Sequence, residues 1–207
     1  MIHSSNHFDE RARTWDDDPV KHARALAVAE GIRGQVPLSP QMHALEYGCG
    51  TGLLGFALRP HLGRLTLADS SDGMLAVARE KIAHARVTNM RTLTLDLAVD
   101  PVPDERYDLI CSLLTFHHVE DVADVLRKLF VLLASPGYLC VADLDLEDGS
   151  FHGPWFSGHK GFDRTELGSM AERAGFRNVR FNTVLHVQKD ESAGQSSFPL
   201  FLMVAEK

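Results

Sequence analysis

The 207-residue sequence has only three cysteines, two tryptophans and no long apolar run. Three cysteines without a Cys-x-x-Cys spacing argue against a disulfide framework and a cysteine-type metal site. Cys49, Cys111 and Cys140 each lie in an apolar stretch, so we expect reduced, buried thiols in a cytoplasmic protein. No apolar segment approaches the ~20 residues of a membrane-spanning helix, and we expect no membrane partner.

The sequence also lacks a surplus of basic residues. It has 21 lysines and arginines against 28 aspartates and glutamates, a formal net charge of −7. Proteins that follow nucleic-acid phosphates normally carry a basic face, so we expect no nucleic-acid partner. The polar, acidic N-terminal stretch does not resemble a secretory signal, which again favours the cytoplasm.

Apolar strand-like runs alternate with helical patterns along most of the chain. We expect strands at 42–47, 64–69, 90–97, 107–116 and 137–146, and helices at 19–35, 51–58, 72–85, 119–133 and 163–176. Strands separated by such helices imply right-handed crossovers and a mainly parallel sheet. Between the third and fourth strands, Pro101 and Pro103 leave little prospect of a crossover helix.

The end of the chain breaks this alternation. The connection between strands at 179–188 and 198–207 is too short for a crossover, so they should pair antiparallel. The predicted fold is therefore α/β: a Rossmann-like, doubly wound, mainly parallel seven-stranded sheet. It has a C-terminal antiparallel β-hairpin and helices on both faces.

The stretch HALEYGCGTGLLGFAL, residues 43–58, raises the question of a ligand. Gly48, Gly50 and Gly52 alternate where the first strand meets its helix, and glycine there permits a tight turn and close approach of a ligand to the main chain. A dinucleotide fingerprint needs a small residue where Leu53 stands, and a P-loop needs Gly-Lys-Ser/Thr. A turn that serves only strand–helix packing is the alternative.

The segment LEYGCGTG resembles the E/D-x-G-x-G-x-G signature of class I S-adenosylmethionine-dependent methyltransferases. The likeness extends over residues 42–207 and is greatest to small-molecule enzymes of the ubiquinone-biosynthesis kind, type 11. It implies S-adenosylmethionine as cofactor, S-adenosylhomocysteine as product, and one methyltransferase domain over residues 1–207. We expect an N-terminal lid and helix at 1–40 and a cofactor-binding core at 41–146. An acceptor-site loop at 147–162 and a C-terminal helix and hairpin at 163–207 should follow.

The resemblance implies that Gly48, Cys49 and Gly50 lie against the methionine half of the cofactor. Glu46 would orient this turn and the cofactor's amino group. Asp69 ends the second strand, where a carboxylate can accept hydrogen bonds from both ribose hydroxyls. The alternative role for such a residue, a helix N-cap, falls more naturally to Ser70, Ser71 or Asp72.

Further cofactor contacts are expected beyond these. Met74 resembles the family's apolar wall for adenine, although its alternative is ordinary helix core. Asp96 resembles the acidic residue that accepts a bond from the adenine amino group, and Leu97 beside it would supply a backbone amide and an apolar contact. Ser70 and Ser112 are also expected to lie against the cofactor.

The acceptor site is predicted from three segments. After the fourth strand, His117 is the candidate general base, because histidine titrates near neutral pH; the alternatives for it and its neighbour His118 are capping and packing. The loop after the fifth strand offers His152, Trp155 and His159 as substrate contacts. Trp15, with Phe8, would anchor an N-terminal lid; an anchored tail is the alternative.

These residues predict methyl transfer to an O, N, S or C atom of a small, aromatic or apolar molecule, by a monomer or homodimer. A cofactor-binding regulatory domain without turnover is one alternative. A nicotinamide-dependent reductase is another, disfavoured by Leu53 and by the missing Tyr-x-x-x-Lys pair. The acids and histidines between Asp143 and His159 lack His-x-x-x-His-type spacing, so we expect no metal.

Overall fold

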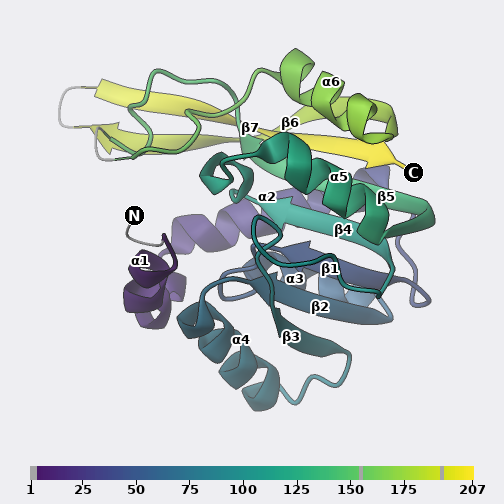
Figure 1. The fold of residues 1–207 in the computed structure, drawn as a ribbon. Coiled ribbons are helices and arrows are strands. Elements are labelled where there is room, and N and C mark those ends of the chain that lie inside the picture. Colours follow the sequence, from purple (N-terminus) through teal and green to yellow (C-terminus); the bar gives the residue numbers. More distant parts are fainter. Residues whose placement is uncertain (1–3, 154–155, 192–193) are drawn as a thin grey trace.

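A seven-stranded sheet, in the order β3-β2-β1-β4-β5-β7-β6, forms the centre of the molecule (Figure 1). The computed structural model describes residues 4–153, 156–191 and 194–207. The strands are β1 (His43–Tyr47), β2 (Arg64–Asp69), β3 (Met90–Thr94), β4 (Tyr107–Leu113), β5 (Leu133–Leu144), β6 (Arg177–Glu191) and β7 (Gly194–Glu206). The longer helices are α1 (Ser4–Arg11), α2 (Pro19–Gln35), α4 (Asp72–His84), α5 (Val122–Leu132) and α6 (Arg164–Ala174).

Four strand pairs are parallel and two are antiparallel. β1 pairs with β2 and β4, β2 with β3, and β4 with β5, all in parallel. β7 runs antiparallel to both of its neighbours, β5 and β6. The predicted doubly wound sheet with one reversed strand near its edge is therefore confirmed.

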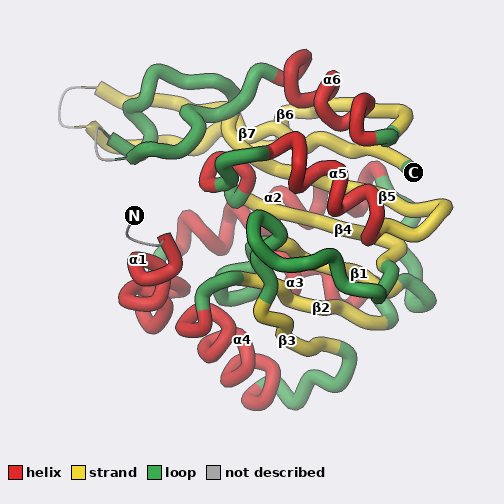
Figure 2. The backbone as a smooth tube through the Cα atoms, in the orientation of Figure 1, coloured by secondary structure: helices red, strands yellow, loops and turns green. Residues whose placement is uncertain are grey.

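Helices cover both faces of the sheet, as predicted (Figure 2). Successive residues of β1 face opposite layers: Ala44 packs in one apolar cluster and Leu45 in the other. One cluster includes side chains of α2, the short helix α3 (Leu53–Leu58) and α4, and the other includes side chains of α5 and α6. Because both faces are covered, the residues of the central strands β1, β2 and β4 are almost continuously buried.

β3 and β4 each end three residues earlier than predicted. β4 stops at Leu113 because Leu114 has a φ of +53° and turns the chain out of the sheet. A short 3₁₀ helix, η3 (Phe116–His118), follows, and α5 begins only at Val122. β3 stops at Thr94, since Asp96 begins a turn in which its carboxylate accepts the amide of Ala98 at 2.9 Å. No helix occurs in the fully described connection 95–106, as its prolines predicted.

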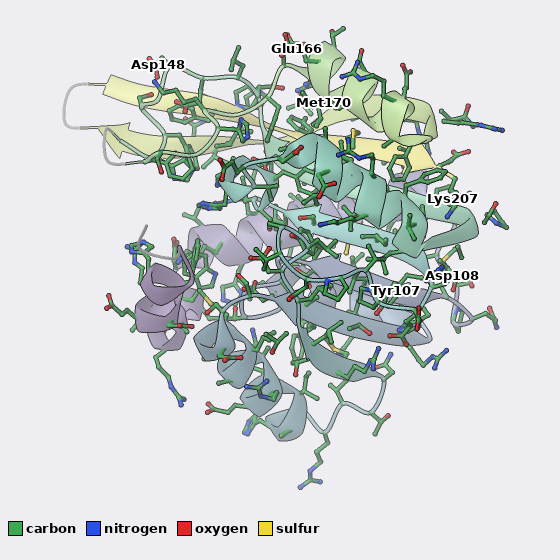
Figure 3. The ribbon with its side chains drawn as sticks, viewed as in Figure 1. Tyr107, Asp108, Asp148, Glu166, Met170 and Lys207 are labelled. Carbon is green, nitrogen blue, oxygen red and sulfur yellow. The ribbon has the colours of Figure 1, made fainter. Side chains whose placement is uncertain are left out.

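The carboxyl ends of the parallel strands face the side on which α1 and the connection 145–163 lie (Figure 1). Tyr107 and Asp108, at the beginning of β4, lie at the opposite end of the sheet with Lys207 (Figure 3). The three cysteines are buried and unpaired, as expected. None of the helices built from described residues has the length and apolar character needed to span a membrane.

Candidate functional site

A cavity of about 1090 Å³ opens beyond the carboxyl ends of the strands. Its lining comes from the N-terminal segment, from α2, from the turns after β1, β2, β3 and β4, and from the connection after β5. Ligands of doubly wound sheets bind at this edge, next to the first strand. Most of the predicted site residues line this one space: Glu46, Gly48, Cys49, Gly50, Asp69, Ser70, Met74, Asp96, His117, Trp15, His152 and His159.

The glycine turn after β1 is held in a conformation that side chains disfavour. Gly48, Gly50 and Gly52 have φ values of +69°, +53° and +83°. A Cβ atom at Gly48 would lie 2.2 Å from the Thr115 side chain. At Gly50 the nearest atoms would be 3.9 Å and 4.0 Å away, so Gly50 exposes bare main chain to the cavity.

Glu46 lies beneath this turn and is almost completely buried. Its Oε2 accepts a hydrogen bond of 2.8 Å from the backbone amide of Gly55, which fixes α3 against β1. Burial raises the pKa of Glu46 from 4.5 to about 8, against the lowering effects of Gly55 and of Lys81. The site thus holds a carboxyl group that a nearby cation would ionise.

Replacing Glu46 with glutamine is expected to stabilise the unliganded protein at alkaline pH. The raised pKa means that the folded state binds more protons than the unfolded chain between pH 4.5 and about 8, so the free energy of unfolding falls as pH rises through that range. At pH 9 the variant should be more stable by up to roughly 5 kcal/mol, the free energy that a pKa change from 4.5 to about 8 represents, and at pH 4 the difference should vanish. Urea denaturation measures this. Glu172→Gln, at an exposed position on α6, is the control; a pH-independent difference contradicts the prediction.

Asp69, at the end of β2, connects the two turns that flank it. Its carboxylate accepts hydrogen bonds from the amides of Gly50 at 2.7 Å and Ser71 at 2.9 Å. Burial raises its pKa against these backbone bonds. A carboxylate offers about four lone-pair positions, so Asp69 keeps acceptor capacity toward the cavity that it lines. The N-cap of α4 is Ser71, whose Oγ accepts the amide of Met74 at 3.1 Å.

Not every predicted cofactor contact lies on the cavity. Met74 and Asp96 line it, and Leu95 adds an apolar side chain that was not predicted. Leu97 and Ser112, also predicted as cofactor contacts, are not among the residues that line the cavity. Leu97 is fully buried in the core, and its carbonyl accepts from Lys128 Nζ at 2.5 Å. The Ser112 hydroxyl donates to the carbonyl of Tyr47 at 2.8 Å, and so joins β4 to β1.

His117 and Asp143 form a buried pair on the far side of the cavity from the β2–β3 edge. Nδ1 of His117 lies 2.7 Å from Oδ1 of Asp143, and the His117 amide donates to Oδ2 at 3.3 Å. Side-chain exposure is 2% for His117 and 0% for Asp143. Asp143 belongs to β5 and His117 to η3, so the pairing depends on the neighbouring β4 and β5 ending together.

The connection after β5 folds back over this pair. Backbone hydrogen bonds join Leu146 to Phe162 and Glu147 to Lys160 at its base, and the His159 amide donates to the carbonyl of His117 at 2.8 Å. The rings of His152 and Phe156 stack with centroids 4.0 Å apart. The ring of His159 bonds instead to the carbonyl of Val119 at 2.9 Å, which tethers the loop. Trp155, a predicted substrate contact, lies outside the described residues.

A family model described as a methyltransferase domain matches residues 45–139. That range contains the glycine turn, Asp69, Asp96 and His117. Over this range the chain is similar to the S-adenosylmethionine-dependent methyltransferases, the family that its glycine signature resembles.

Curated relatives and a solved structure agree with this similarity. The chain is 35% identical over 180 residues, 83% of its length, to a biotin biosynthesis bifunctional protein of Bordetella avium, and covers 37% of that protein. It is 33% identical over 112 residues, 52% of its length, to a ubiquinone biosynthesis O-methyltransferase of Marinobacter nauticus, of which it covers 46%. It therefore spans less than half the length of these relatives. An S-adenosylmethionine-dependent methyltransferase of Aquifex aeolicus shares the fold: its TM-score is 0.71 at 21% identity, with 96% of this chain and 97% of the other covered.

The N-terminal segment closes one side of the cavity. Asp9 accepts hydrogen bonds from the Ser71 hydroxyl at 2.6 Å and the Gly73 amide at 2.8 Å, at the beginning of α4. Asp16 accepts from the Thr51 hydroxyl at 2.5 Å and Lys81 Nζ at 2.6 Å. These carboxylates fasten residues 4–17 to the two turns that carry the glycines and Asp69. The segment's rings then face the cavity: Phe8 packs edge-on against Trp15 and His118, with centroids 5.8 Å and 5.3 Å apart.

Removing both carboxylates, in the Asp9→Ala/Asp16→Ala variant, is expected to release residues 4–17. Amide hydrogen exchange in that segment should rise at least tenfold, because each carboxylate anchors it through two hydrogen bonds. Exchange in β1, β4 and β5 should not change. Glu10→Ala, at an exposed position on the same helix, serves as the control. Equal exchange in all three proteins shows that the carboxylates do not hold the segment.

Sequence reasoning missed the cations that line the same side. Lys21 and Arg24, one turn apart on α2, both line the cavity. Lys21 Nζ lies 3.7 Å from the centre of the Trp15 ring and donates to the Trp15 carbonyl at 3.1 Å. Nε of Arg24 is buried and has no hydrogen-bond partner among the described residues. Desolvation lowers the pKa of both groups. Their i, i+3 spacing on a predicted helix was the available signal.

Proposed function

We propose that this protein transfers the methyl group of S-adenosylmethionine to a small molecule bound in the cavity. The observation that carries the proposal is that two sides of one cavity are lined by residues of different chemistry. Bare main chain at Gly50, the carboxylates of Asp69 and Asp96, and Met74 lie on one side. The His117–Asp143 pair and the aromatic connection lie on the other. A volume of about 1090 Å³ is at the upper end for a small-molecule site, which supports room for a cofactor and an acceptor.

The residues on the first side fit the cofactor by their chemistry. We propose that the main chain at Gly48–Gly50 receives its methionine part and that Glu46 helps to orient the cationic amino group. We assign the ribose hydroxyls to Asp69 and the adenine to Met74 and Asp96. The bound cofactor supplies a methyl group on a positively charged sulfur. The protein's own contribution is alignment of that methyl group with the acceptor, and orientation alone can supply ~7–11 kcal/mol of a barrier.

Arg24 supports the same orientation. Arg24 lines the cavity and its Nε has no hydrogen-bond partner among the described residues, so the guanidinium favours an anionic ligand group, and we assign it to the cofactor's carboxylate. The variant Arg24→Met is expected to bind S-adenosylhomocysteine about tenfold more weakly, as for one charged hydrogen bond. Its affinity for 5′-methylthioadenosine, which has no amino-acid part, should not change. Isothermal titration measures both; an equal loss for the two ligands contradicts the assignment.

The acceptor side supports a small, flat or apolar molecule. The rings of Phe8, His118 and Phe156 contact one another edge-on around the cavity, and such rings bind aromatic compounds well. The N-terminal segment would close over both ligands as a lid. Three buried, unpaired cysteines favour a reducing compartment, so we place the reaction in the cytoplasm.

The proposal is tested by binding and turnover together. Isothermal titration should show that S-adenosylmethionine and S-adenosylhomocysteine bind, whereas NAD does not. Tritium from methyl-labelled S-adenosylmethionine should then enter a small aromatic acceptor. Binding of NAD with neither adenosyl compound rejects the proposal. Binding of the adenosyl compounds with no transfer to any acceptor favours a domain without turnover.

A further inference from the structure

We infer that Asp143 and His117 act as a dyad that accepts the proton of a hydroxyl group, so that the methyl acceptor is an alcohol or a phenol. The inference rests on the proposed function and narrows its acceptor class. It assigns Asp143, at the end of β5, the role of a positioning residue that acts through His117.

The hydrogen bonds of Asp143 determine which nitrogen of His117 carries a proton. An ionised carboxylate only accepts hydrogen bonds, so the proton between Asp143 and His117 belongs to Nδ1. The same carboxylate also accepts the amides of His117 at 3.3 Å and Leu144 at 2.8 Å, which hold its plane in place. Nε2 of His117 is then the unprotonated nitrogen. It makes no hydrogen bond with any described residue, and His117 lines the cavity.

A hydroxyl group is the kind of acceptor that uses such a base, because it loses its proton when its oxygen is methylated. The acceptor oxygen attacks the methyl carbon with a lone pair, the carbon–sulfur bond breaks, and its electron pair goes to sulfur. The O–H bond breaks as its proton passes to Nε2, so the positive charge of the sulfonium ends on the His117 imidazolium beside Asp143. Water later removes that proton. A carboxylic acid is already ionised near neutral pH and has no proton to give.

The titratable groups around His117 do not place a positive charge beside the imidazolium that forms. The titratable groups that face it are Asp143 from β5, His118 from η3 and His152 from the connection after β5. Desolvation in the cavity, with His117 and His152 nearby, lowers the pKa of His118 to about 3. A neutral His118 adds no positive charge next to a protonated His117, whereas the buried Asp143 carboxylate stabilises it.

The acceptor class is tested with a panel that differs only in the attacking atom. The wild type is incubated with methyl-labelled S-adenosylmethionine and 4-methylphenol, 4-methylcatechol, 4-methylbenzenethiol, 4-methylbenzoate or 4-methylaniline. Label is expected in the phenol or the catechol at a higher rate than in the other three compounds. The variant His117→Gln should lower kcat about 10²- to 10⁴-fold, as for loss of a general base. Its affinity for S-adenosylhomocysteine should stay within twofold of the wild type.

The positioning role of Asp143 is tested by measurements that would not change if Asp143 only stabilised the fold. In Asp143→Asn, kcat should fall at least tenfold with little change in KM. Histidine ¹⁵N NMR should show the His117 proton on Nδ1 in the wild type and on Nε2 in the variant, because an asparagine NH₂ donates to Nδ1. Asp143→Glu should restore part of kcat. Melting temperature and product affinity verify that the variants fold.

The outcomes separate this inference from the proposed function. If the wild type binds neither adenosyl compound, the proposed function fails and the inference fails with it. If it binds them but labels no hydroxyl compound, or labels the thiol, the carboxylate or the amine faster, only the inference is overturned. It is also overturned if His117→Gln is as active as the wild type, or if the wild-type His117 proton resides on Nε2.

Discussion

Replacing Asp69 with alanine is expected to weaken binding of S-adenosylhomocysteine about 10- to 100-fold. A hydrogen bond to a charged group contributes ~1.5–3 kcal/mol, and 1.4 kcal/mol is a factor of ten. Asp69 affects binding in two ways in our account, because it also holds the amide of Gly50 at 2.7 Å. The alanine variant removes the ribose contact and loosens the turn that receives the methionine part.

Isothermal titration with S-adenosylhomocysteine measures this loss of affinity. Two further variants show whether the loss is specific to the Asp69 carboxylate. Asp69→Asn keeps one acceptor oxygen and should lose less affinity than the alanine variant. Asp72→Asn removes the charge of an exposed carboxylate three residues away, which does not line the cavity, and should bind as the wild type does. An unchanged affinity in Asp69→Ala shows that the ribose is held elsewhere.

Alanine at Gly48 is expected to destabilise the fold by about 2–5 kcal/mol. A left-handed conformation costs ~1–2 kcal/mol for a residue with a side chain, and overpacking costs ~1–3 kcal/mol more. The added Cβ would lie 2.2 Å from the Thr115 side chain. Thr115 cannot turn away freely, because its hydroxyl bonds to the Gly48 carbonyl at 3.1 Å.

Two other glycines make this prediction specific. Gly50→Ala has room for its methyl group but a φ of +53°, and that methyl group would stand in the cavity. It should fold, with a loss of ~1–2 kcal/mol, and bind the cofactor poorly. Gly34→Ala meets no atom within 4 Å and sits in the exposed part of α2. It should be neutral or stabilise by ~1 kcal/mol. Urea denaturation of all three variants tests the series, and equal stabilities contradict it.

Much of the fold was predictable because its signals are local. The apolar runs of β1, β2 and β4 and the helix over Pro19–Gln35 follow from periodicity alone. The antiparallel hairpin follows from the length of one connection. The ends of β3 and β4 were not predictable in this way. They depend on a side-chain turn of Asp96 within a run that otherwise alternates like a strand, and on Leu114 with φ of +53°, although leucine is not a usual strand breaker.

Site residues were predictable where a single short segment of the sequence contains the recognisable motif. The glycine turn and Asp69 could be located because each follows a strand directly. The pairing of His117 with Asp143 could not, since it joins residues 26 positions apart on η3 and β5. The surroundings of Ser112 and Leu97 were not predictable either. The Ser112 hydroxyl donates to the carbonyl of Tyr47 on the neighbouring strand, and the side chain of Leu97 is buried in the core.

A crystal structure with S-adenosylhomocysteine bound tests the central claim most directly. The account predicts the ribose hydroxyls on Asp69, the adenine beside Met74 and Asp96, and the amino-acid part on the main chain of Gly48–Gly50. The sulfur should face the side of the cavity that His117 lines. A ligand that lies elsewhere, or whose sugar is out of reach of Asp69, contradicts the account.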